Sequence, residues 1–193
     1  MALTSIEICA GAGGQALGLE QAGFDHVAVV EIDRHACATL RENRPGWNVV
    51  EGDVVEWIHS HAREYTGVDL VAGGVPCPPF SQAGKQLGAQ DERDLFPAMI
   101  ELVRVVRPRA VMIENVRGLL DPKFDQYRQQ VTERMAALGY SLQWRLLQAS
   151  DFGVPQLRPR VVAVGMRDDA GAPFEYPSPL PTGAPSVGEA LRD

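Results

Sequence analysis

Short apolar runs alternate with stretches of helical character along most of this chain. Runs rich in β-branched and other apolar residues predict strands, and the longer stretches between them carry apolar residues at helical spacing. The predicted strands are residues 5–9, 26–32, 49–53, 68–74, 110–115, 141–148 and 160–166. The predicted helices are residues 15–22, 34–43, 54–64, 94–106 and 126–138.

This alternation predicts βαβ units and therefore an α/β protein with a largely parallel sheet. Right-handed crossovers would place helices on both faces of the sheet. The last two predicted strands are joined only by a loop, so we expect them to pair antiparallel. Ligands of such sheets bind at the carboxyl ends of the strands, and the unusual residues of this chain follow strands.

The pattern changes at Asp168. Prolines recur between Pro173 and Pro185, and they leave no regular element until a short helical start at Ser186. We therefore expect one cofactor-binding and catalytic domain over residues 1–167 and a Pro-rich tail over residues 168–193.

Composition narrows the class of protein. The chain has 193 residues, of which 45% are hydrophobic, enough for one substantial core. No apolar run approaches the roughly 20 residues of a membrane helix, and the first residues lack a basic secretory n-region. Its three cysteines do not have metal-site spacing. These features favour a reduced, cytoplasmic protein without a metal centre and without contact with a membrane.

The net charge of −7 gives little general attraction for nucleic acid. The acidic surplus lies within residues 1–75, however, whereas residues 128–167 carry a basic surplus. A mildly basic face in the later part of the chain therefore remains compatible with the sequence.

A glycine loop and two acids follow the first three predicted strands. Residues 11–18 match the pattern G-x-G-x-x-A, which is typical of a turn that lets a nucleotide approach bare backbone. Glu31 is placed to bind ribose hydroxyls, and Asp53 to accept a hydrogen bond from an adenine amino group. Together they predict an adenosine cofactor, and they fit a nicotinamide dinucleotide as well as S-adenosylmethionine.

Chemically active side chains follow the later strands. Cys77 lies between prolines, which stiffen its backbone as nucleophilic catalysis requires. Glu114 ends an apolar strand, where partial loss of hydration would suit it to act as an acid at neutral pH. Arg158 and Arg160 precede the last strand and could hold a phosphate, a base carbonyl oxygen or a carboxylate. Residues 82–93 are polar and glycine-containing, which suggests a mobile lid.

The order of these motifs resembles that of the DNA (cytosine-5) methyltransferase family over residues 5–167. The motifs are the glycine loop, Glu31, Asp53, Pro76-Cys77, Glu114-Asn115-Val116 and Gln156-x-Arg158-x-Arg160. The resemblance implies the class I S-adenosylmethionine-dependent methyltransferase fold, a Rossmann-like mixed seven-stranded sheet with the last strand antiparallel.

The resemblance also implies roles for individual residues. Cys77 would attack carbon 6 of a flipped cytosine, and Glu114 would contact its ring nitrogen 3 and amino group. Asn115 would hold the strand end that carries Glu114, and Arg160, with Arg158, would contact the cytosine carbonyl oxygen. Phe80 and Ser81 would belong to the loop that closes on DNA. The expected S-adenosylmethionine-binding residues are Cys9, Ala10, Gly11, Gly13, Gly14, Glu31, Ile32, Asp53, Val54 and Pro76.

Two positions depart from the family pattern. Cys9 stands where the family often has phenylalanine, which would make a smaller wall for the cofactor, and Pro78 stands where glutamine commonly follows the nucleophile.

Family members normally continue into a target-recognition domain and a segment that returns to the cofactor pocket. From the resemblance we expect this chain to be the catalytic part of a split or truncated enzyme, with a second polypeptide that supplies recognition. It would methylate carbon 5 of cytosine in DNA, in a prokaryotic or phage-encoded setting such as restriction-modification.

Three other interpretations compete with this one. One branch of the family methylates tRNA cytosine, and the residues around Cys77 do not separate the two substrates. A non-catalytic cofactor-binding subunit could keep the same fold, although the presence of Cys77, Glu114 and Arg160 argues against loss of catalysis. A nicotinamide-dependent dehydrogenase would use the glycine loop but would have no use for Cys77 or the two arginines.

Overall fold

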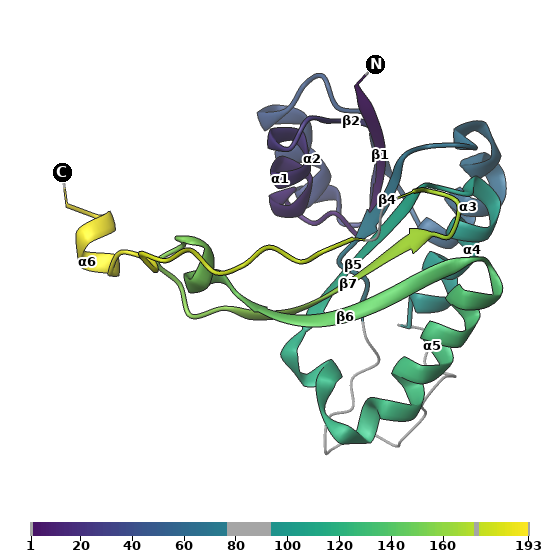
Figure 1. Ribbon diagram of the computed structural model, residues 1–193. Coiled ribbons are helices and arrows are strands. Elements are labelled where there is room, and N and C mark those ends of the chain that lie inside the picture. The colour runs from purple at the N-terminus through teal and green to yellow at the C-terminus, as the bar shows by residue number, and fades with distance from the viewer. Residues whose placement is uncertain (1, 77–93, 172–173, 193) are drawn as a thin grey trace.

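A computed structural model describes residues 2–76, 94–171 and 174–192 (Figure 1). Within this part of the chain, strands and helices alternate up to β5. The strands are β1 (Leu3–Ile8), β2 (Phe24–Glu31), β3 (Val49–Glu51), β4 (Leu70–Gly73), β5 (Ala110–Val116), β6 (Tyr140–Gln148) and β7 (Pro159–Arg167). The α-helices are α1 (Gly14–Gln21), α2 (Arg34–Asn43), α3 (Val54–His61), α4 (Phe96–Val106), α5 (Asp125–Ala137) and α6 (Val187–Ala190).

The strands form one mixed sheet in the order β3-β2-β1-β4-β5-β7-β6. The first five are parallel, and β7 is antiparallel to both of its neighbours, β5 and β6. Helices α1 and α2 cover one face of the sheet, and α3, α4 and α5 cover the other (Figure 1). The predicted seven-stranded Rossmann-like α/β sheet with helices on both faces is confirmed.

Several predicted element boundaries differ from the structure by two or three residues, and three of them have a clear local cause. The third strand stops at Glu51 because Asp53 caps α3. Helix α3 ends at His61, and a tighter 3₁₀ helix, η1 (Ala62–Tyr65), continues the turn. Helix α4 begins at Phe96 rather than at Asp94, because the Asp94 carboxylate accepts a hydrogen bond from the Phe96 amide at 3.0 Å.

The main core lies between the sheet and helices α3 to α5. It includes Ile6 and Ile8 of β1 and Phe96, Met99 and Leu102 of α4, all less than 2% exposed. Burial of such side chains stabilises the fold by about 1.5–3 kcal/mol each. Among the described residues, no helix is long and apolar enough to span a membrane.

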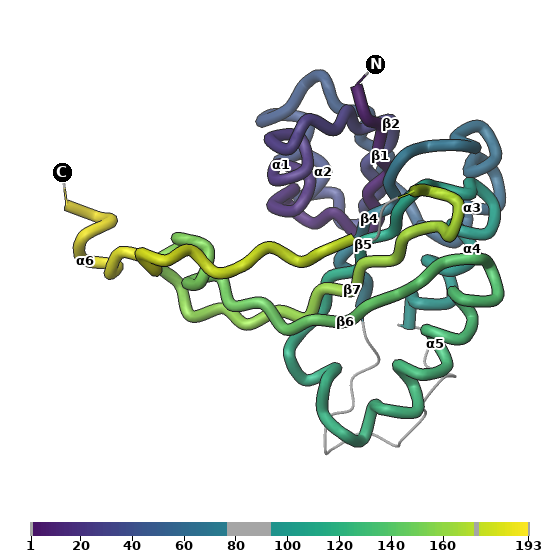
Figure 2. The backbone as a smooth tube through the Cα atoms, in the orientation of Figure 1, coloured from purple at the N-terminus to yellow at the C-terminus, as the bar shows by residue number. Residues whose placement is uncertain are grey.

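The tail runs as an extended strap beside the β6–β7 hairpin (Figure 2). The Tyr176 hydroxyl lies 2.8 Å from the carbonyl oxygens of Gln143 and Val162, to which it can donate in turn. The Leu180 amide donates to the Asp151 carbonyl at 2.7 Å. These bonds hold the strap against both strands of the hairpin.

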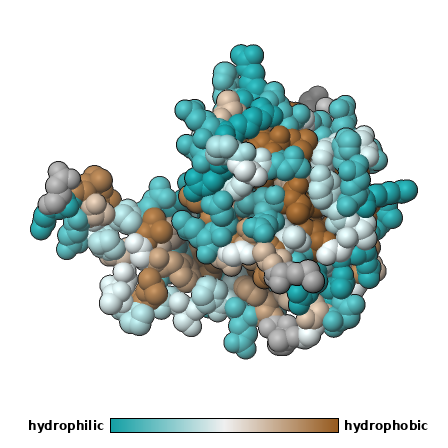
Figure 3. Space-filling model, turned by 90° about the horizontal axis from the view of Figure 1, so that it is seen from above, coloured by the Kyte–Doolittle hydropathy of each residue, from teal (hydrophilic) through white to brown (hydrophobic). Residues whose placement is uncertain are grey.

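The connection between β6 and β7 and the end of the strap with α6 project together from the rest of the molecule as an arm (Figure 1). This arm displays apolar side chains on its surface (Figure 3). The most exposed of these are Leu157 at 85% and Leu191 at 77%. Since β7 runs antiparallel to β5 and pairs Arg160 with Val116, the arm lies beyond the carboxyl end of β5.

One ionisable side chain lies deep beneath α1. Glu7 of β1 is 1% exposed, and its Oε2 has no hydrogen-bond partner in the described part of the chain. Burial raises the pKa of Glu7 from 4.5 to about 8, so the carboxyl group holds its proton at neutral pH.

We expect Glu7→Gln to remove a pH dependence of stability. Between about pH 4.5 and 8 the unfolded chain releases the Glu7 proton and the native chain retains it, so native stability falls as pH rises through this window. Relative to the glutamine variant, the wild-type free energy of unfolding should fall by on the order of a few kcal/mol. Urea unfolding of both proteins at several pH values measures the difference, and parallel profiles would contradict the expectation.

Candidate functional site

A cavity of about 280 Å³ opens at the carboxyl ends of the parallel strands. Such an edge is where ligands of doubly wound sheets bind. The residues that line it lie at or just after the ends of four neighbouring strands, or just before α4; they are Cys9, Gly11, Val30, Glu31, Ile32, Gly52, Asp53, Val54, Gly74, Pro76 and Leu95. A more open hollow of about 390 Å³ lies beside it between β3 and α3 and shares Gly52 and Asp53 with it.

Glu31 ties the glycine loop to the end of β2. Its Oε2 accepts a hydrogen bond from the Gly11 amide at 2.7 Å. Its Oε1 accepts from the Ile32 and Asp33 amides at 2.9 and 2.8 Å. The carboxylate therefore fixes two segments of the cavity wall while it faces the cavity.

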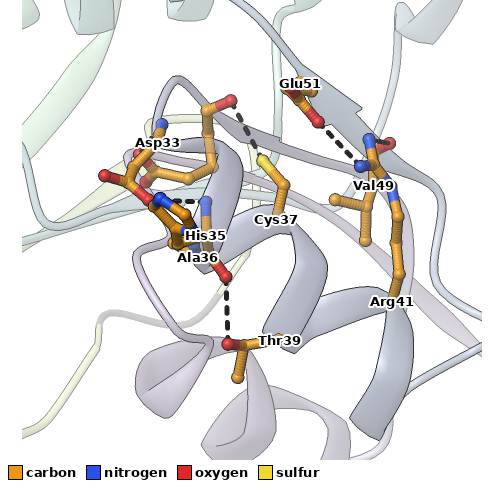
Figure 4. Close-up of polar contacts among 9 residues, drawn as sticks. Asp33, His35, Ala36, Cys37, Thr39, Arg41, Val49 and Glu51 are labelled. Carbon is orange, nitrogen blue, oxygen red and sulfur yellow. Dashed lines mark hydrogen bonds and ion pairs between the residues drawn. The ribbon is translucent and has the colours of Figure 1, made fainter.

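Helix α2 makes polar contacts with the ends of β2 and β3 (Figure 4). Asp33 caps this helix through Oδ1, which accepts from the His35 and Ala36 amides at 2.8 and 2.9 Å. The Cys37 thiol lies 3.4 Å from the Glu31 carbonyl oxygen, to which it donates. Farther along α2, Arg41 joins Glu51 of β3 in an ion pair at 2.7 Å. The helix thus links the ends of β2 and β3.

Asp53 lines the opposite wall of the cavity and also caps α3. Its Oδ1 accepts from the Val55 and Glu56 amides at 2.7 and 3.1 Å and so caps α3. Its Oδ2 has no hydrogen-bond partner in the described ranges and remains available to a ligand donor.

Cys9 lines the cavity with an uncharged side chain. Its backbone has a φ of 54°, the left-handed region that turns the chain into the glycine loop. Burial, with the nearby carboxylates of Glu31, Asp53 and Glu7, raises the pKa of the Cys9 thiol to about 12. The thiol therefore stays protonated and is a poor nucleophile.

Most of the residues expected to bind a cofactor lie together in this cavity: Cys9, Gly11, Glu31, Ile32, Asp53, Val54 and Pro76. Ala10, Gly13 and Gly14 are not among its lining residues. Gly13 instead packs beside Leu40 and Trp47, where an added Cβ would lie 2.5 Å from Leu40 Cδ2.

Sequence reasoning did not single out four of the lining residues, Val30, Gly52, Gly74 and Leu95. The first three lie at or just after strand ends, so their position along the chain could have indicated them. Leu95 had no such signal, because it reaches the cavity through tertiary packing.

Two charged residues predicted for catalysis meet next to this cavity. Arg160 Nε of β7 lies 2.7 Å from Glu114 Oε1 of β5, and the two side chains are 26% and 34% exposed. The antiparallel pairing of β5 with β7 places them two positions apart on adjacent strands. The charge-assisted bond orients the Glu114 carboxylate. The Arg158 side chain is exposed and makes no hydrogen bond or ion pair within the described residues.

Asn115 lies one residue farther along β5 and is buried. Its Nδ2 donates to the Val75 carbonyl at 2.8 Å, and its Oδ1 accepts from the Val116 amide at 2.8 Å. This side chain therefore connects β5 to the backbone just before Pro76.

Pro76 and Leu95, which lie on either side of residues 77–93 in the chain, are close together at the cavity. The Leu95 amide lies 3.5 Å from the Pro76 carbonyl oxygen, and both residues line the cavity wall. Cys77, Phe80 and Ser81, together with the expected lid at residues 82–93, lie outside the described residues. Among the described residues there is no cluster of side chains suited to a metal ion.

The mixed seven-stranded sheet with an antiparallel β7, and the cavity at the carboxyl ends of its parallel strands, define a Rossmann-like α/β protein with a ligand site. Residues 3–190 match the family of C-5 cytosine-specific DNA methylases, and the chain belongs to this family.

Similar proteins come from several bacteria. The chain is 59% identical over 193 residues to the type II methyltransferase M.NgoMIV of Neisseria gonorrhoeae, covering 100% of this chain and 61% of that protein. It is 57% identical to the type II methyltransferase M.NaeI of Lentzea aerocolonigenes, covering 99% of this chain and 46% of that protein. The chain thus spans about half of the length of these relatives.

A solved structure has the same fold. It is described as a DNA modification methyltransferase encoded within a prophage of Escherichia coli, and it superposes with a TM-score of 0.74 at 28% identity. The match covers 90% of this chain and 49% of that one.

Proposed function

We propose that this chain transfers a methyl group from S-adenosylmethionine to carbon 5 of cytosine in DNA. The observation that carries the proposal is the meeting of three features at one edge of the sheet. These are the cavity, the Glu114–Arg160 ion pair and Pro76, the residue before Cys77. Family membership over residues 3–190 supports the same reaction.

The cavity residues suit an adenosine cofactor. Glu31 would accept hydrogen bonds from the ribose, Asp53 Oδ2 would accept one from the adenine amino group, and Ile32 and Val54 would pack against the base. The Ile32 side chain is apolar yet 68% exposed, so it is free to pack against a planar ligand. The cofactor supplies an electrophilic methyl group on its sulfonium.

Catalysis on the base would fall to a second group of residues. Cys77 would add as a thiolate to carbon 6 of the cytosine, which makes carbon 5 nucleophilic enough to take the methyl group from the sulfonium. Loss of the carbon 5 proton would then restore the ring double bond and expel the thiolate. Glu114 holds ring nitrogen 3 and the amino group, Arg160 and Arg158 hold the carbonyl oxygen, and Asn115 positions the backbone before Cys77. The base must first leave the duplex.

Target recognition would come from elsewhere than residues 1–167. The chain spans 61% and 46% of the two relatives. Its net charge of −7 gives little attraction for phosphates. We infer that a recognition domain joins the Pro-rich tail at residues 168–193, and that a second polypeptide can supply it. A cytoplasmic restriction-modification system of bacterial or phage origin is the setting we propose.

Calorimetry with S-adenosylhomocysteine tests the cofactor assignment. We expect binding by the wild-type chain, weakened at least about tenfold by Glu31→Ala, because that change releases both the ribose acceptor and the Gly11 amide. NADH serves as the competing ligand. Binding of NADH without binding of S-adenosylhomocysteine would overturn the proposal.

A transfer assay with tritiated cofactor on mixed-sequence DNA tests the recognition requirement. We expect little site-specific labelling by the purified chain, and strong labelling once a polypeptide with the recognition domain is added. Sequence readout needs side chains in the grooves, and base flipping costs a few kcal/mol that those contacts offset. Strong, site-specific labelling by the chain alone would contradict the split arrangement.

A further inference from the structure

Three residues from neighbouring strands form a row across the carboxyl edge of the sheet. Ile8 of β1 pairs with Gly73 of β4, and Gly73 pairs with Ile113 of β5. Cys9 and Gly74 directly follow β1 and β4, and Glu114 is the next residue of β5; a Cβ on Gly74 would lie within 4 Å of both Cys9 and Glu114. Cys9 and Gly74 line the cavity, whereas Glu114 belongs to the ion pair. Gly74 is therefore the residue between the cavity and the proposed base-binding carboxylate.

The Glu114 carboxylate uses the space that Gly74 leaves by having no side chain. A Cβ at Gly74 would lie 3.3 Å from Glu114 Oε2 and 3.9 Å from the Cys9 carbonyl oxygen. The first distance is shorter than most Cβ contacts in proteins, so the carboxylate would have to move by a few tenths of an ångström.

The carboxylate has little freedom to move without a cost. Its other oxygen, Oε1, lies 2.7 Å from Arg160 Nε. Displacement of Oε2 from Gly74 would therefore lengthen or bend that bond, and charge-assisted bonds weaken steeply away from their preferred geometry. Arg160 on one side and Gly74 on the other together fix the carboxylate position.

Gly73, the neighbouring residue, must be glycine because of packing in the core. A Cβ at Gly73 would lie 2.8 Å from Ile8 Cγ1, 2.8 Å from the Ile8 carbonyl oxygen and 3.0 Å from Met99 Cε. Those contacts involve backbone and core, so a side chain at Gly73 would disturb the fold. At Gly74 the close contact is with the end of one polar side chain, so a methyl group there is compatible with folding.

We propose that Gly74 is a positioning residue for methyl transfer, whose missing side chain lets the Glu114 carboxylate lie over β4 against the cofactor cavity. This inference rests on the proposed function. Gly74 acts on the reaction through Glu114, and it contributes no chemical group of its own.

The test compares Gly74→Ala with Gly18→Ala, a matched control at an exposed position of α1 where an added Cβ has no neighbour within 4 Å. Three quantities are measured on the full chain: the NMR signal of the Arg160 Nε–H group, the affinity for S-adenosylhomocysteine, and the single-turnover rate of tritiated methyl transfer. The transfer assays contain mixed-sequence DNA and the recognition polypeptide in equal amounts.

We expect Gly74→Ala to shift the Arg160 Nε–H signal and to slow transfer by about tenfold, since misplacement of a catalytic group by 1 Å can cost about 10²-fold. Its affinity for S-adenosylhomocysteine should change by less than about threefold. Gly18→Ala should match the wild type in all three. Assignment of the shifted signal is checked with Arg160→Lys, which lacks it.

Two results would overturn the inference. One is an Arg160 signal and a transfer rate that Gly74→Ala leaves at wild-type values. The other is a loss of S-adenosylhomocysteine affinity as large as the loss of rate, which would place the effect in the cavity. A wild-type chain that fails to bind S-adenosylhomocysteine would instead contradict the proposed function, and the Arg160 signal would still decide the geometric claim.

Discussion

Cys77→Ser is expected to abolish measurable methyl transfer, with a loss of at least about 10³-fold. A serine hydroxyl is far less acidic than a thiol, so it does not supply the anion that must add to carbon 6 of cytosine. Affinity for S-adenosylhomocysteine should stay within about twofold of wild type, because the proposed nucleophile acts on the base. Tritium transfer and calorimetry measure the two quantities.

Cys37→Ser is the matched control for the nucleophile. Cys37 is a buried residue of α2, and its thiol donates to the Glu31 carbonyl. A serine hydroxyl can donate the same bond, so transfer should persist. DNA that contains 5-fluorocytosine should trap the wild-type chain covalently at Cys77. A trapped adduct at Cys9 or Cys37 would refute the assignment.

Gly13→Ala is expected to destabilise the fold by about 3 kcal/mol. Gly13 has a φ of 88°, a left-handed conformation that costs other residues about 1–2 kcal/mol. The new Cβ would also lie 2.5 Å from Leu40 Cδ2 and 3.3 Å from Trp47 Cζ3, and overpacking of this kind costs about 1–3 kcal/mol. Chemical denaturation measures the change in the free energy of unfolding.

Gly14→Ala provides the comparison for Gly13. Gly14 is the first residue of α1, and an added Cβ there has no neighbour within 4 Å. Alanine favours a helix over glycine, so this variant should be as stable as the wild type or slightly more stable. Equal losses of stability at both positions would show that the need for glycine at Gly13 comes from the loop as a whole. It would then not come from the packing of Gly13 against Leu40 of α2.

Much of the fold follows from local pattern. Each run that the pattern predicts as a strand overlaps a strand of the sheet. The apolar runs among the first five suit buried parallel strands. The order of strands depends on tertiary contacts. That β7 enters between β5 and β6 is a matter of pairing between residues far apart in the chain, and no local signal encodes it.

The candidate site was less completely predictable. Glu31 and Asp53 could be located because acids after parallel strands lie at the ligand edge. The hydrogen bonds of these two carboxylates to backbone amides could not be predicted, because they depend on how the loops fold around each carboxylate. Gly13 belongs to the same motif as Gly11, yet its neighbours are Leu40 and Trp47, which only the packing of α2 brings near.

The order of the sheet has a consequence for the growing chain on the ribosome. The described residues that line the cavity lie between Cys9 and Leu95, whereas the ion pair with Glu114 requires Arg160. Since synthesis delivers the amino-terminal part first, the strands around the cavity emerge and can assemble before β7 has been made. Until β7 arrives, the outer edge of β5 has no partner and is open to pairing with other chains. A nascent chain stalled at that stage would therefore present a cofactor pocket and an aggregation-prone strand edge at the same time.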